Sequence, residues 1–129
     1  MSATQHRFCL STVRTLKKLK DAVPFLHPVD PIVLGIPHYP TIIKKPMDLS
    51  TVERNLISSN PSKPDPAVTR PPYLNADEFV NDVKLIFDNC ATFNGVDHVI
   101  TKMGRRIEAV FDKQIKQLPP NEEVRIFHH

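Results

Sequence analysis

Residues 75–95 read NADEFVNDVKLIFDNCATFNG, and this stretch decides the fold class. Asn75 is a favourable helix N-cap, and Glu78, three residues later, completes a capping-box pattern. Apolar side chains then recur with helical spacing and share one face: Phe79, Val83, Ile86, Phe87 and Cys90. The pattern ends at Asn94-Gly95, a pair that breaks helices. We therefore predict a helix over about residues 76–92.

Proline positions divide the rest of the chain. Of the 13 prolines, 11 fall between residues 24 and 72, and proline interrupts helical hydrogen bonding. Long helices are therefore confined to the proline-free stretches 1–23 and 73–118. Apolar periodicity predicts three further helices, over about residues 6–22, 48–56 and 100–118.

These helices define the fold class. The first has an apolar face made of Cys9, Val13, Leu16, Leu19 and Val23. The short one begins at Asp48 or Ser50, either of which is a good cap. No segment shows the period-two alternation of a strand, so we predict an all-α protein, an up-and-down four-helix bundle. Successive connections in such a bundle alternate between its two ends. Residues 24–47 and 94–98 should therefore share one end.

The two long connections differ in character. Residues 24–47 are rich in large apolar side chains and should fold onto the bundle rather than remain in water. A connection of this length inside a compact domain is usually functional, so a binding site is expected there. Residues 58–72 read SSNPSKPDPAVTRPP, with only Ala67 and Val68 apolar. We predict a mobile surface loop, distant from that site.

Composition indicates a soluble intracellular domain. The 129 residues are 40% hydrophobic, enough for one core, and the net charge of +3 is too small for a disordered tail. No apolar run suits a membrane span, and the N-terminus lacks an export signal. Cys9 and Cys90 lie far apart, which fits a reducing compartment. We expect Cys90 to be an inert residue on a helix face; the alternative is a reactive thiol.

Basic residues concentrate near the start of the chain. Residues 1–20 carry five basic side chains and no acid, whereas the remainder carries 12 basic and 14 acidic ones. The cluster Lys17, Lys18 and Lys20 is either a solvated helix face or a stripe that makes weak contact with DNA phosphates. We favour the solvated face, because the rest of the chain is not basic.

A series of short motifs follows one order along the chain: Val23-Pro24-Phe25, Pro28-Val29-Asp30, Pro37-x-Tyr39, Ile42-Ile43, Pro46-Met47-Asp48-Leu49, Asn89-Cys90, Phe93-Asn94, NGVDH over residues 94–98, and Met103. In this order and spacing they resemble a bromodomain of the BET class, and most of all the first bromodomain of the fungal members. The resemblance implies a left-handed four-helix bundle over residues 6–118, with flanking tails at 1–5 and 119–129.

The resemblance also implies a function. It indicates a nuclear module that binds acetylated lysine on histone tails in chromatin-linked transcription regulation, without enzymatic activity, metal or cofactor. Histone H4 tails with two acetyl-lysines are the expected ligand, and histone H3 is a further candidate. We expect the isolated domain to be a monomer with no membrane association.

The same resemblance assigns residues to the site. Asn94 donates its side-chain N–H to the acetyl oxygen, and Tyr39 holds a water that bridges to the same oxygen. The apolar channel around the lysine stem consists of Val29, Leu34, Ile36, Pro24, Phe25, Phe93 and the gatekeeper Ile100. Val23 and His98 are expected at the rim. Unmodified lysine is excluded, since its ammonium would lose hydration with no carboxylate to pair it.

Each assignment has a structural alternative. An Asn before a Gly commonly ends a helix, and Tyr39 could be a buried anchor. Val29, Leu34 and Ile36 could be ordinary core residues, and His98 an ordinary exposed loop residue.

Two positions depart from the family pattern. Val23 stands where BET bromodomains often have Trp, which leaves Pro24 and Phe25 as the shelf beside the pocket. Phe93 stands where Tyr is common, which removes a hydroxyl but keeps the Asn94 donor. Residues 58–72 are also longer than the usual connection between the second and third helices.

Other function classes fit the sequence less well. An enzyme is disfavoured, because the three glycines form no phosphate loop and the six histidines show no catalytic or metal-binding spacing. The alternative function is a basic helical module that binds DNA or protein without recognising acetyl-lysine. Salt dependence separates the two, since phosphate binding weakens steeply with ionic strength.

Overall fold

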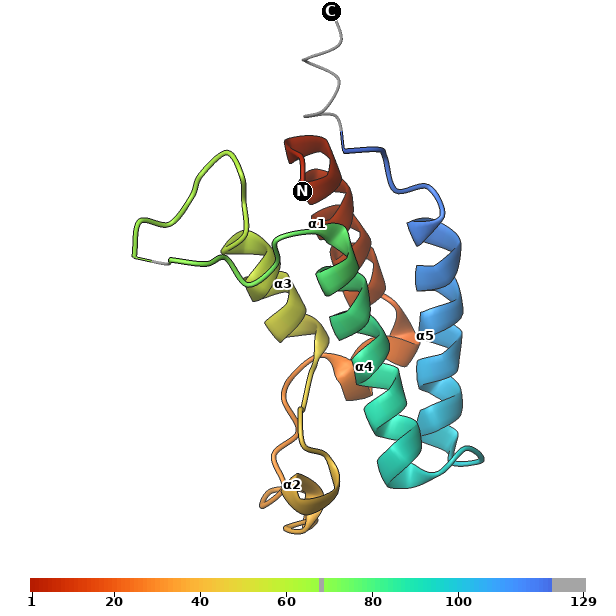
Figure 1. Ribbon diagram of the computed structural model, residues 1–129. Coiled ribbons are helices and arrows are strands. Elements are labelled where there is room, and N and C mark those ends of the chain that lie inside the picture. Colours follow the sequence, from red (N-terminus) through yellow and green to blue (C-terminus); the bar gives the residue numbers. More distant parts are fainter. Residues whose placement is uncertain (68, 122–129) are drawn as a thin grey trace, which may run out of the picture.

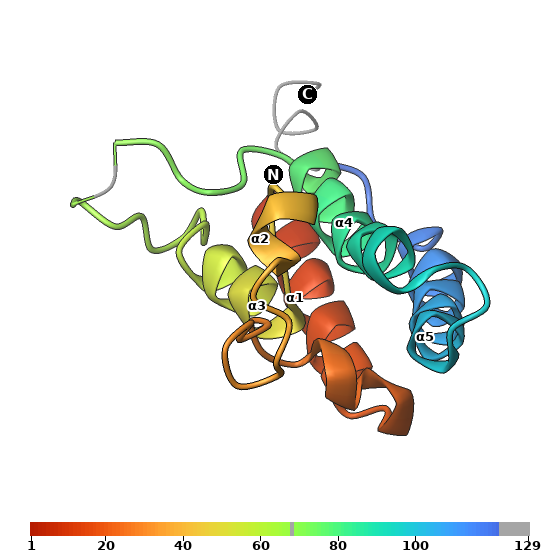
Figure 2. The same cartoon turned by 90° about the horizontal axis from the view of Figure 1, so that it is seen from below.

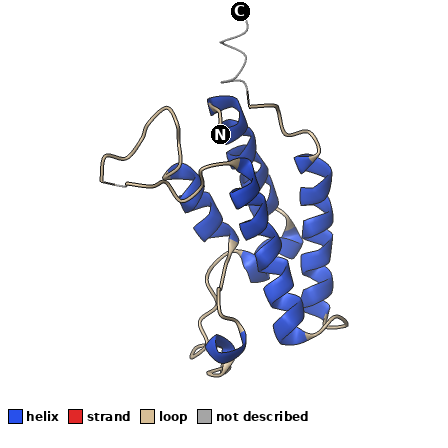
Figure 3. Ribbon diagram, in the orientation of Figure 1, coloured by secondary structure: helices blue, strands red, loops and turns tan. Residues whose placement is uncertain are grey.

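The computed structural model describes residues 1–67 and 69–121, and every regular element in this part is helical (Figure 1, Figure 3). Val68 and residues 122–129, including most of the expected C-terminal tail, lie outside the described residues. The elements in chain order are α1 (Ala3–Lys17), the 3-10 helix η1 (Lys20–Phe25), α2 (Tyr39–Ile42), α3 (Leu49–Ile57), α4 (Ala76–Asn94) and α5 (Val99–Ile115). The predicted all-α class is confirmed.

Side-chain caps fix the starts of α3 and α4 as the sequence indicates. The Asn75 side chain accepts a hydrogen bond from the Glu78 amide at 3.0 Å, and Asp48 accepts one from the Thr51 amide at 3.0 Å. Asp48 is therefore the cap of α3 rather than Ser50. The Glu78 carboxylate accepts from the amide of Leu74, one residue before the cap, so the capping box closes one residue further out than usual.

The first helix differs from its predicted range of 6–22. It begins at Ala3, inside the expected tail 1–5, because the Ser2 hydroxyl accepts from the Gln5 amide at 3.2 Å. It ends at Lys17, and Leu19 is extended. An α-helix cannot run through residues 20–24, because Pro24 has no amide hydrogen and its ring clashes with the preceding turn. The chain instead forms η1, and this leaves Val23, predicted in the buried face, 67% exposed.

One core joins all four long helices. Its fully buried large side chains come from α1, α3, α4 and α5 and include Val13, Leu16, Leu49, Val52, Leu56, Phe79, Val83, Phe87, Ile107 and Phe111. Phe79 and Phe111 meet edge to face with ring centroids 5.8 Å apart, a geometry favoured by the aromatic quadrupole. Figure 2 shows the ends of α1, α3, α4 and α5 from below, with the helices side by side.

Connections alternate between the two ends of the bundle, as predicted. In Figure 1 the loop after α1 and the turn between α4 and α5 both lie at the lower end, while the connection between α3 and α4 lies at the upper end. The upper connection is closed at its base by a hydrogen bond from the Tyr73 amide to the Ser59 hydroxyl at 2.9 Å. Among the described residues, no helix combines the length and hydrophobicity that a membrane span requires.

The expectation that residues 24–47 fold onto the bundle as a whole is wrong for the tip of this loop. Tyr39 and Ile43 are buried, but Ile32 and Val33 are each 79% exposed. The tip does not need the bundle, since the Asp30 carboxylate accepts from the amides of Ile32 and Val33 at 3.1 and 3.2 Å. Local hydrogen bonds thus satisfy the turn and leave its apolar side chains in water.

Candidate functional site

A pocket of about 360 Å³ lies at the lower end of the bundle, between the first loop, the end of α4 and the start of α5. All nine residues that the sequence assigns to its walls and polar end line it: Pro24, Phe25, Val29, Leu34, Ile36, Tyr39, Phe93, Asn94 and Ile100. They come from four separate segments of the chain. The lining contains no Asp, Glu, Lys or Arg.

Aromatic contacts position one side of the pocket. The centroids of the Tyr39 and Phe93 rings lie 4.9 Å apart, and the His38 ring stacks on Phe93 with centroids 5.4 Å apart. Tyr39 is 8% exposed, so it is both a buried anchor and a lining residue. Burial, with a smaller effect of nearby Cys90, raises the pKa of the Tyr39 phenol. Its hydroxyl therefore remains neutral and able to donate or accept.

The opposite wall depends on a close approach between α5 and η1. Phe25 meets Phe87 edge to face at 5.5 Å. A Cβ atom added at Gly104 would lie 2.9 Å from Cζ of Phe25 and 3.2 Å from Cδ1 of Phe87. Only glycine therefore allows α5 to approach the Phe25 ring this closely. The Pro24-Phe25 shelf is thus placed by a residue that does not itself line the pocket.

Asn94 occupies the polar end of the pocket. It is the last residue of α4, and Gly95, with φ of 92°, is the C-cap. The amide of Gly95 donates to the Ala91 carbonyl at 2.8 Å. The alternative interpretation of Asn94 as the cap is therefore wrong, and its side chain is not committed to ending the helix. Its Nδ2 donates to Cys90 Sγ at 3.5 Å.

The first loop is tied to α4 by polar contacts. The Asn89 amide donates to the Lys45 carbonyl at 2.8 Å, and the Lys45 ammonium pairs with Asp82 at 3.3 Å. The Tyr73 hydroxyl donates to the other oxygen of Asp82 at 2.7 Å. These bonds hold the C-terminal half of the loop against the helix that carries Asn94.

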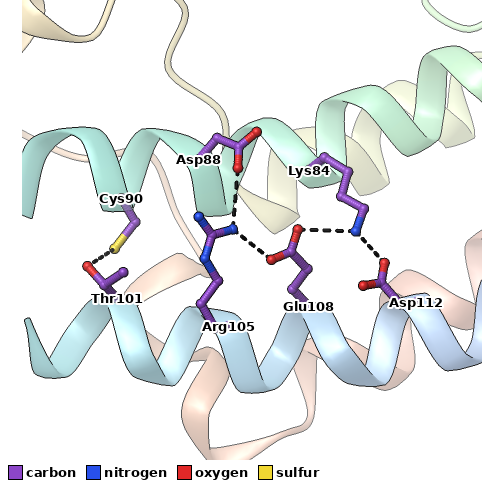
Figure 4. Close-up of polar contacts among 7 residues, drawn as sticks. All are labelled: Lys84, Asp88, Cys90, Thr101, Arg105, Glu108 and Asp112. Carbon is purple, nitrogen blue, oxygen red and sulfur yellow. Dashed lines mark hydrogen bonds and ion pairs between the residues drawn. The ribbon is translucent and has the colours of Figure 1, made fainter. Parts of the chain in front are cut away.

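Facing charges join α4 to α5 (Figure 4). Lys84 pairs with Glu108 at 3.1 Å and with Asp112, and Arg105 pairs with Glu108 at 2.7 Å and with Asp88 at 3.3 Å. The network links the two helices that deliver Asn94 and Ile100. Partly exposed pairs of this kind contribute little stability singly but more as a network.

Two expected rim residues do not line the pocket. Val23, in η1, is 67% exposed and is not part of the lining. His98 is the N-cap of α5, and its Nδ1 accepts from the Ile100 amide at 3.1 Å. His98 therefore orients the first turn that carries Ile100 without entering the pocket.

Four lining residues were not assigned from the sequence: His27, Met47, Ile86 and Cys90. Ile86 and Cys90 share a helix face with Phe93 and Asn94, spaced four, seven and eight residues from Ile86. That periodicity could have identified them, but it is equally the pattern of core residues. His27 carries no sequence signal that separates it from an ordinary loop residue.

The lining defines what the pocket can bind. Apolar walls with no charged side chain favour a neutral, largely apolar group, and burying an unpaired ion there would be costly. Asn94 supplies an amide that can donate to one acceptor. The pocket thus suits a slender neutral side chain that ends in a carbonyl.

Comparison with known proteins identifies the same family that the sequence motifs resemble. The bromodomain family model matches residues 9–106. The chain is 42% identical over 95% of its length to the SWR1 complex bromodomain subunit bdf1 of Schizosaccharomyces pombe, and 39% identical over 90% to bromodomain-containing factor 2 of Saccharomyces cerevisiae. It covers 19% and 16% of those proteins, less than a fifth of their length.

Solved bromodomain structures have the same fold as this chain. The second bromodomain of Candida albicans Bdf1, in its unbound form, superposes with a TM-score of 0.75 at 41% identity, covering 89% of this chain and 98% of that one. The same domain has been solved with an imidazopyridine bound, and it matches with the same TM-score and identity. Sequence and fold agree over most of the chain, which therefore belongs to the bromodomain family.

Proposed function

We propose that this chain binds acetylated lysine in the pocket around Asn94. The observation that carries the proposal is a single side-chain amide at the end of an apolar pocket whose lining has no charged residue. The acetyl oxygen would accept from Asn94 Nδ2, and Tyr39 would hold a bridging water. The aliphatic stem of the lysine would lie between the Pro24-Phe25 shelf and Ile100.

The same chemistry separates acetylated from unmodified lysine. An ammonium entering this pocket would lose its hydration and meet the Asn94 amide hydrogens and apolar walls. No carboxylate of the lining would pair with it. Acetylation removes the charge and adds the acceptor that Asn94 requires.

Histone tails are the proposed ligands, with diacetylated H4 preferred and H3 as a further candidate. Support comes from exposed apolar side chains in and next to the two loops at this end of the bundle: Ile32, Val33, Leu34, Val96 and Val99 are all more than 60% exposed. Such side chains can cover a second neutralised lysine side chain. The fungal relatives are named as a bromodomain subunit of the SWR1 complex and as a bromodomain-containing factor, so we propose a nuclear reader within a longer fungal BET-like protein.

Two finer features belong to this proposal. We place the domain at about residues 6–118, with its first helix extending back to Ala3. We also keep the resemblance to a first rather than a second bromodomain, which rests on the motif pattern. The solved relatives described above are second bromodomains. A binding profile on acetylated peptides from several histones would separate the two kinds of domain.

Calorimetric titration with H4 peptides tests the proposal. The expected order of affinity is diacetylated, then monoacetylated, with no measurable heat for the unmodified peptide. Equal binding of acetylated and unmodified peptides would contradict acetyl-lysine recognition. Equal binding of mono- and diacetylated peptides would contradict only the role of the exposed apolar side chains at this end of the bundle.

A second candidate function is contact with duplex DNA, and one observation favours it. Within the predicted cluster, the Lys17 ammonium pairs with Glu53 at 2.8 Å, whereas Lys18 and Lys20 are exposed to solvent. The favourable observation is the composition of two nearby grooves. Two adjoining grooves on α1 and α5 contain no carboxylate in their lining, and their cations are Arg7, Arg14, Lys18 and Lys113. Hydroxyls and amides between them are typical phosphate contacts.

Replacing Arg7, Lys18 and Lys113 by Gln tests this second function. None of these three forms an ion pair within the described part of the chain. DNA affinity should fall, and its salt slope should decrease by about one per lost phosphate contact. Acetylated peptide affinity should not change, since the pocket lies at the end of the bundle. An unchanged DNA affinity in the triple variant would contradict a DNA contact at these grooves.

A further inference from the structure

A chain of three hydrogen bonds runs behind the polar end of the pocket. Asn94 Nδ2 donates to Cys90 Sγ at 3.5 Å, Cys90 Sγ lies 3.7 Å from Thr101 Oγ1, and Thr101 Oγ1 donates to the Gly95 carbonyl at 2.7 Å. Figure 4 shows the thiol of α4 facing the hydroxyl of α5. Thr101 is 3% and Cys90 9% exposed. Thr101 is not part of the pocket lining.

The directions of these bonds follow from counting hydrogens. A hydroxyl has one hydrogen, and a carbonyl can only accept. At 2.7 Å from the Gly95 carbonyl, the Thr101 hydrogen is committed to that bond. The contact between Cys90 and Thr101 must then use the S–H hydrogen, which the Thr101 oxygen accepts. The sulfur has no other hydrogen, so toward Asn94 it can only accept.

This direction selects one orientation of the Asn94 amide. The two ends of an Asn side chain have nearly the same shape, but only the nitrogen donates. A sulfur that can only accept holds Nδ2 toward itself and disfavours the flipped amide. We propose that Cys90 and Thr101 are positioning residues for acetyl-lysine recognition, which fix the Asn94 amide so that its second N–H is available to the acetyl oxygen. This inference rests on the proposed function of the pocket.

The proposal makes an unusual prediction for a pair of variants. In Thr101→Val the S–H loses its acceptor and turns to the Asn94 side-chain oxygen, which favours the flipped amide. We expect a five- to tenfold loss of affinity for an acetylated H4 peptide. In the double variant Cys90→Ala/Thr101→Val neither orientation is held, about half of the molecules are competent, and the loss should be only about twofold.

Removing the thiol should therefore partly restore the binding that Thr101→Val loses. A purely structural role of Thr101 in closing the turn at Gly95 predicts the reverse, a double variant at least as weak as the single one. Thr101→Ser keeps the hydroxyl and serves as the matched control, with affinity expected within twofold of the parent. A double variant weaker than Thr101→Val, with both melting cooperatively, would overturn the proposal.

A spectroscopic measurement needs no ligand. The infrared S–H stretch of Cys90, assigned by its loss in Cys90→Ala, should lie below that of a free thiol, because the S–H donates to Thr101. A stretch at the free-thiol position would overturn the proposed direction. Failure of the parent protein to bind any acetylated peptide would instead contradict the proposed function. The infrared measurement tests the direction of the bond between Cys90 and Thr101 independently of peptide binding.

Discussion

At the scale of single residues, Asn94 is the side chain on which the proposed binding of acetyl-lysine depends most. It is the one side-chain amide in the pocket lining, and Gly95 rather than Asn94 ends the helix. Replacement by alanine should thus remove a ligand contact without removing a cap. Loss of a hydrogen bond to a buried neutral partner costs about 1–3 kcal/mol.

We therefore expect Asn94→Ala to weaken acetylated peptide binding by that amount, with little change in melting temperature. Calorimetry and thermal unfolding check the two halves of this expectation. His98→Ala is the matched control from the neighbouring turn, and it should affect the start of α5 more than ligand affinity. Unchanged peptide affinity in Asn94→Ala would mean that another group binds the acetyl oxygen.

A second residue-scale prediction concerns Cys9, which is fully buried in α1. Burial raises the pKa of the Cys9 thiol to about 12. The folded state therefore keeps a proton that the unfolded state loses above its ordinary pKa of 9.0. The contribution of Cys9 to stability is intact below that value and is lost progressively as the pH rises toward 12.

At roughly pH 8, Cys9 should resist alkylation until the protein unfolds, since the thiolate is the reactive form. Peptide mass spectrometry after iodoacetamide treatment, with and without denaturant, measures this directly. Alkylation of Cys9 in the folded protein at the rate of a free thiol would show that α1 opens readily.

At the scale of elements, the approach of α5 to η1 is the critical contact. Gly104→Ala would gain helix propensity of up to about 1 kcal/mol, but its Cβ would meet the Phe25 ring at 2.9 Å. Overpacking of this kind usually costs about 1–3 kcal/mol. We expect a lower melting temperature and weaker peptide binding, because Phe25 lines the pocket.

The double variant Gly104→Ala/Phe25→Leu provides the control. Phe25→Leu removes the outer ring atoms that the new Cβ meets. Gly104→Ala should therefore cost less stability when it is added to Phe25→Leu than when it is added to the parent protein. Additive losses in the thermal unfolding of the two variants would show that the contact is not the cause.

The connection between α3 and α4 provides another element-scale prediction. Residues 61–67, 69 and 70 are exposed, and the connection lies at the end of the bundle opposite the pocket (Figure 1). Replacing residues 60–70 by a short Gly/Ser turn should leave peptide affinity within about twofold, which is ~0.4 kcal/mol. Stability should also change little, because Ser59 and Tyr73, which close the base, are retained.

A tenfold loss of affinity in a shortened chain that still melts cooperatively would show that this connection reaches the pocket. Replacing only Ser62, Lys63 and Pro64 by glycine offers a control of unchanged length. It should behave as the parent does in both measurements.

At the scale of the whole molecule, the helical pattern and the pocket differ in how far sequence reveals them. Periodicity and the caps at Asp48 and Asn75 located α3 and α4 closely, because these signals are local. The end of α1 was misplaced, since apolar spacing continued past Leu16 while Pro24 required a different backbone. The exposed tip at Ile32 and Val33 was also missed, because hydrophobicity alone does not reveal a turn that Asp30 satisfies locally.

The order of the family motifs predicts most of the pocket lining. It does not predict the lining residues Ile86 and Cys90, nor the close approach of Gly104 to Phe25 behind the lining. Ile86 and Cys90 have the same periodicity as core residues, and only their place beside Asn94 distinguishes them. Gly104 lies far in sequence from Phe25, so no local pattern predicts that the two must meet. Both features depend on how separate helices approach one another.

The central claim, that acetyl-lysine enters the pocket around Asn94, is tested most directly by chemical-shift mapping. An ¹⁵N-labelled sample is titrated with a diacetylated H4 peptide and, in parallel, with the unmodified peptide. The account predicts that the acetylated peptide shifts the Asn94 side-chain NH₂ signals and the amides of Tyr39 and Ile100, while the unmodified peptide leaves them in place. Shifts confined to Arg7, Lys18 and Lys113 on α1 and α5, or identical shifts with both peptides, would contradict it.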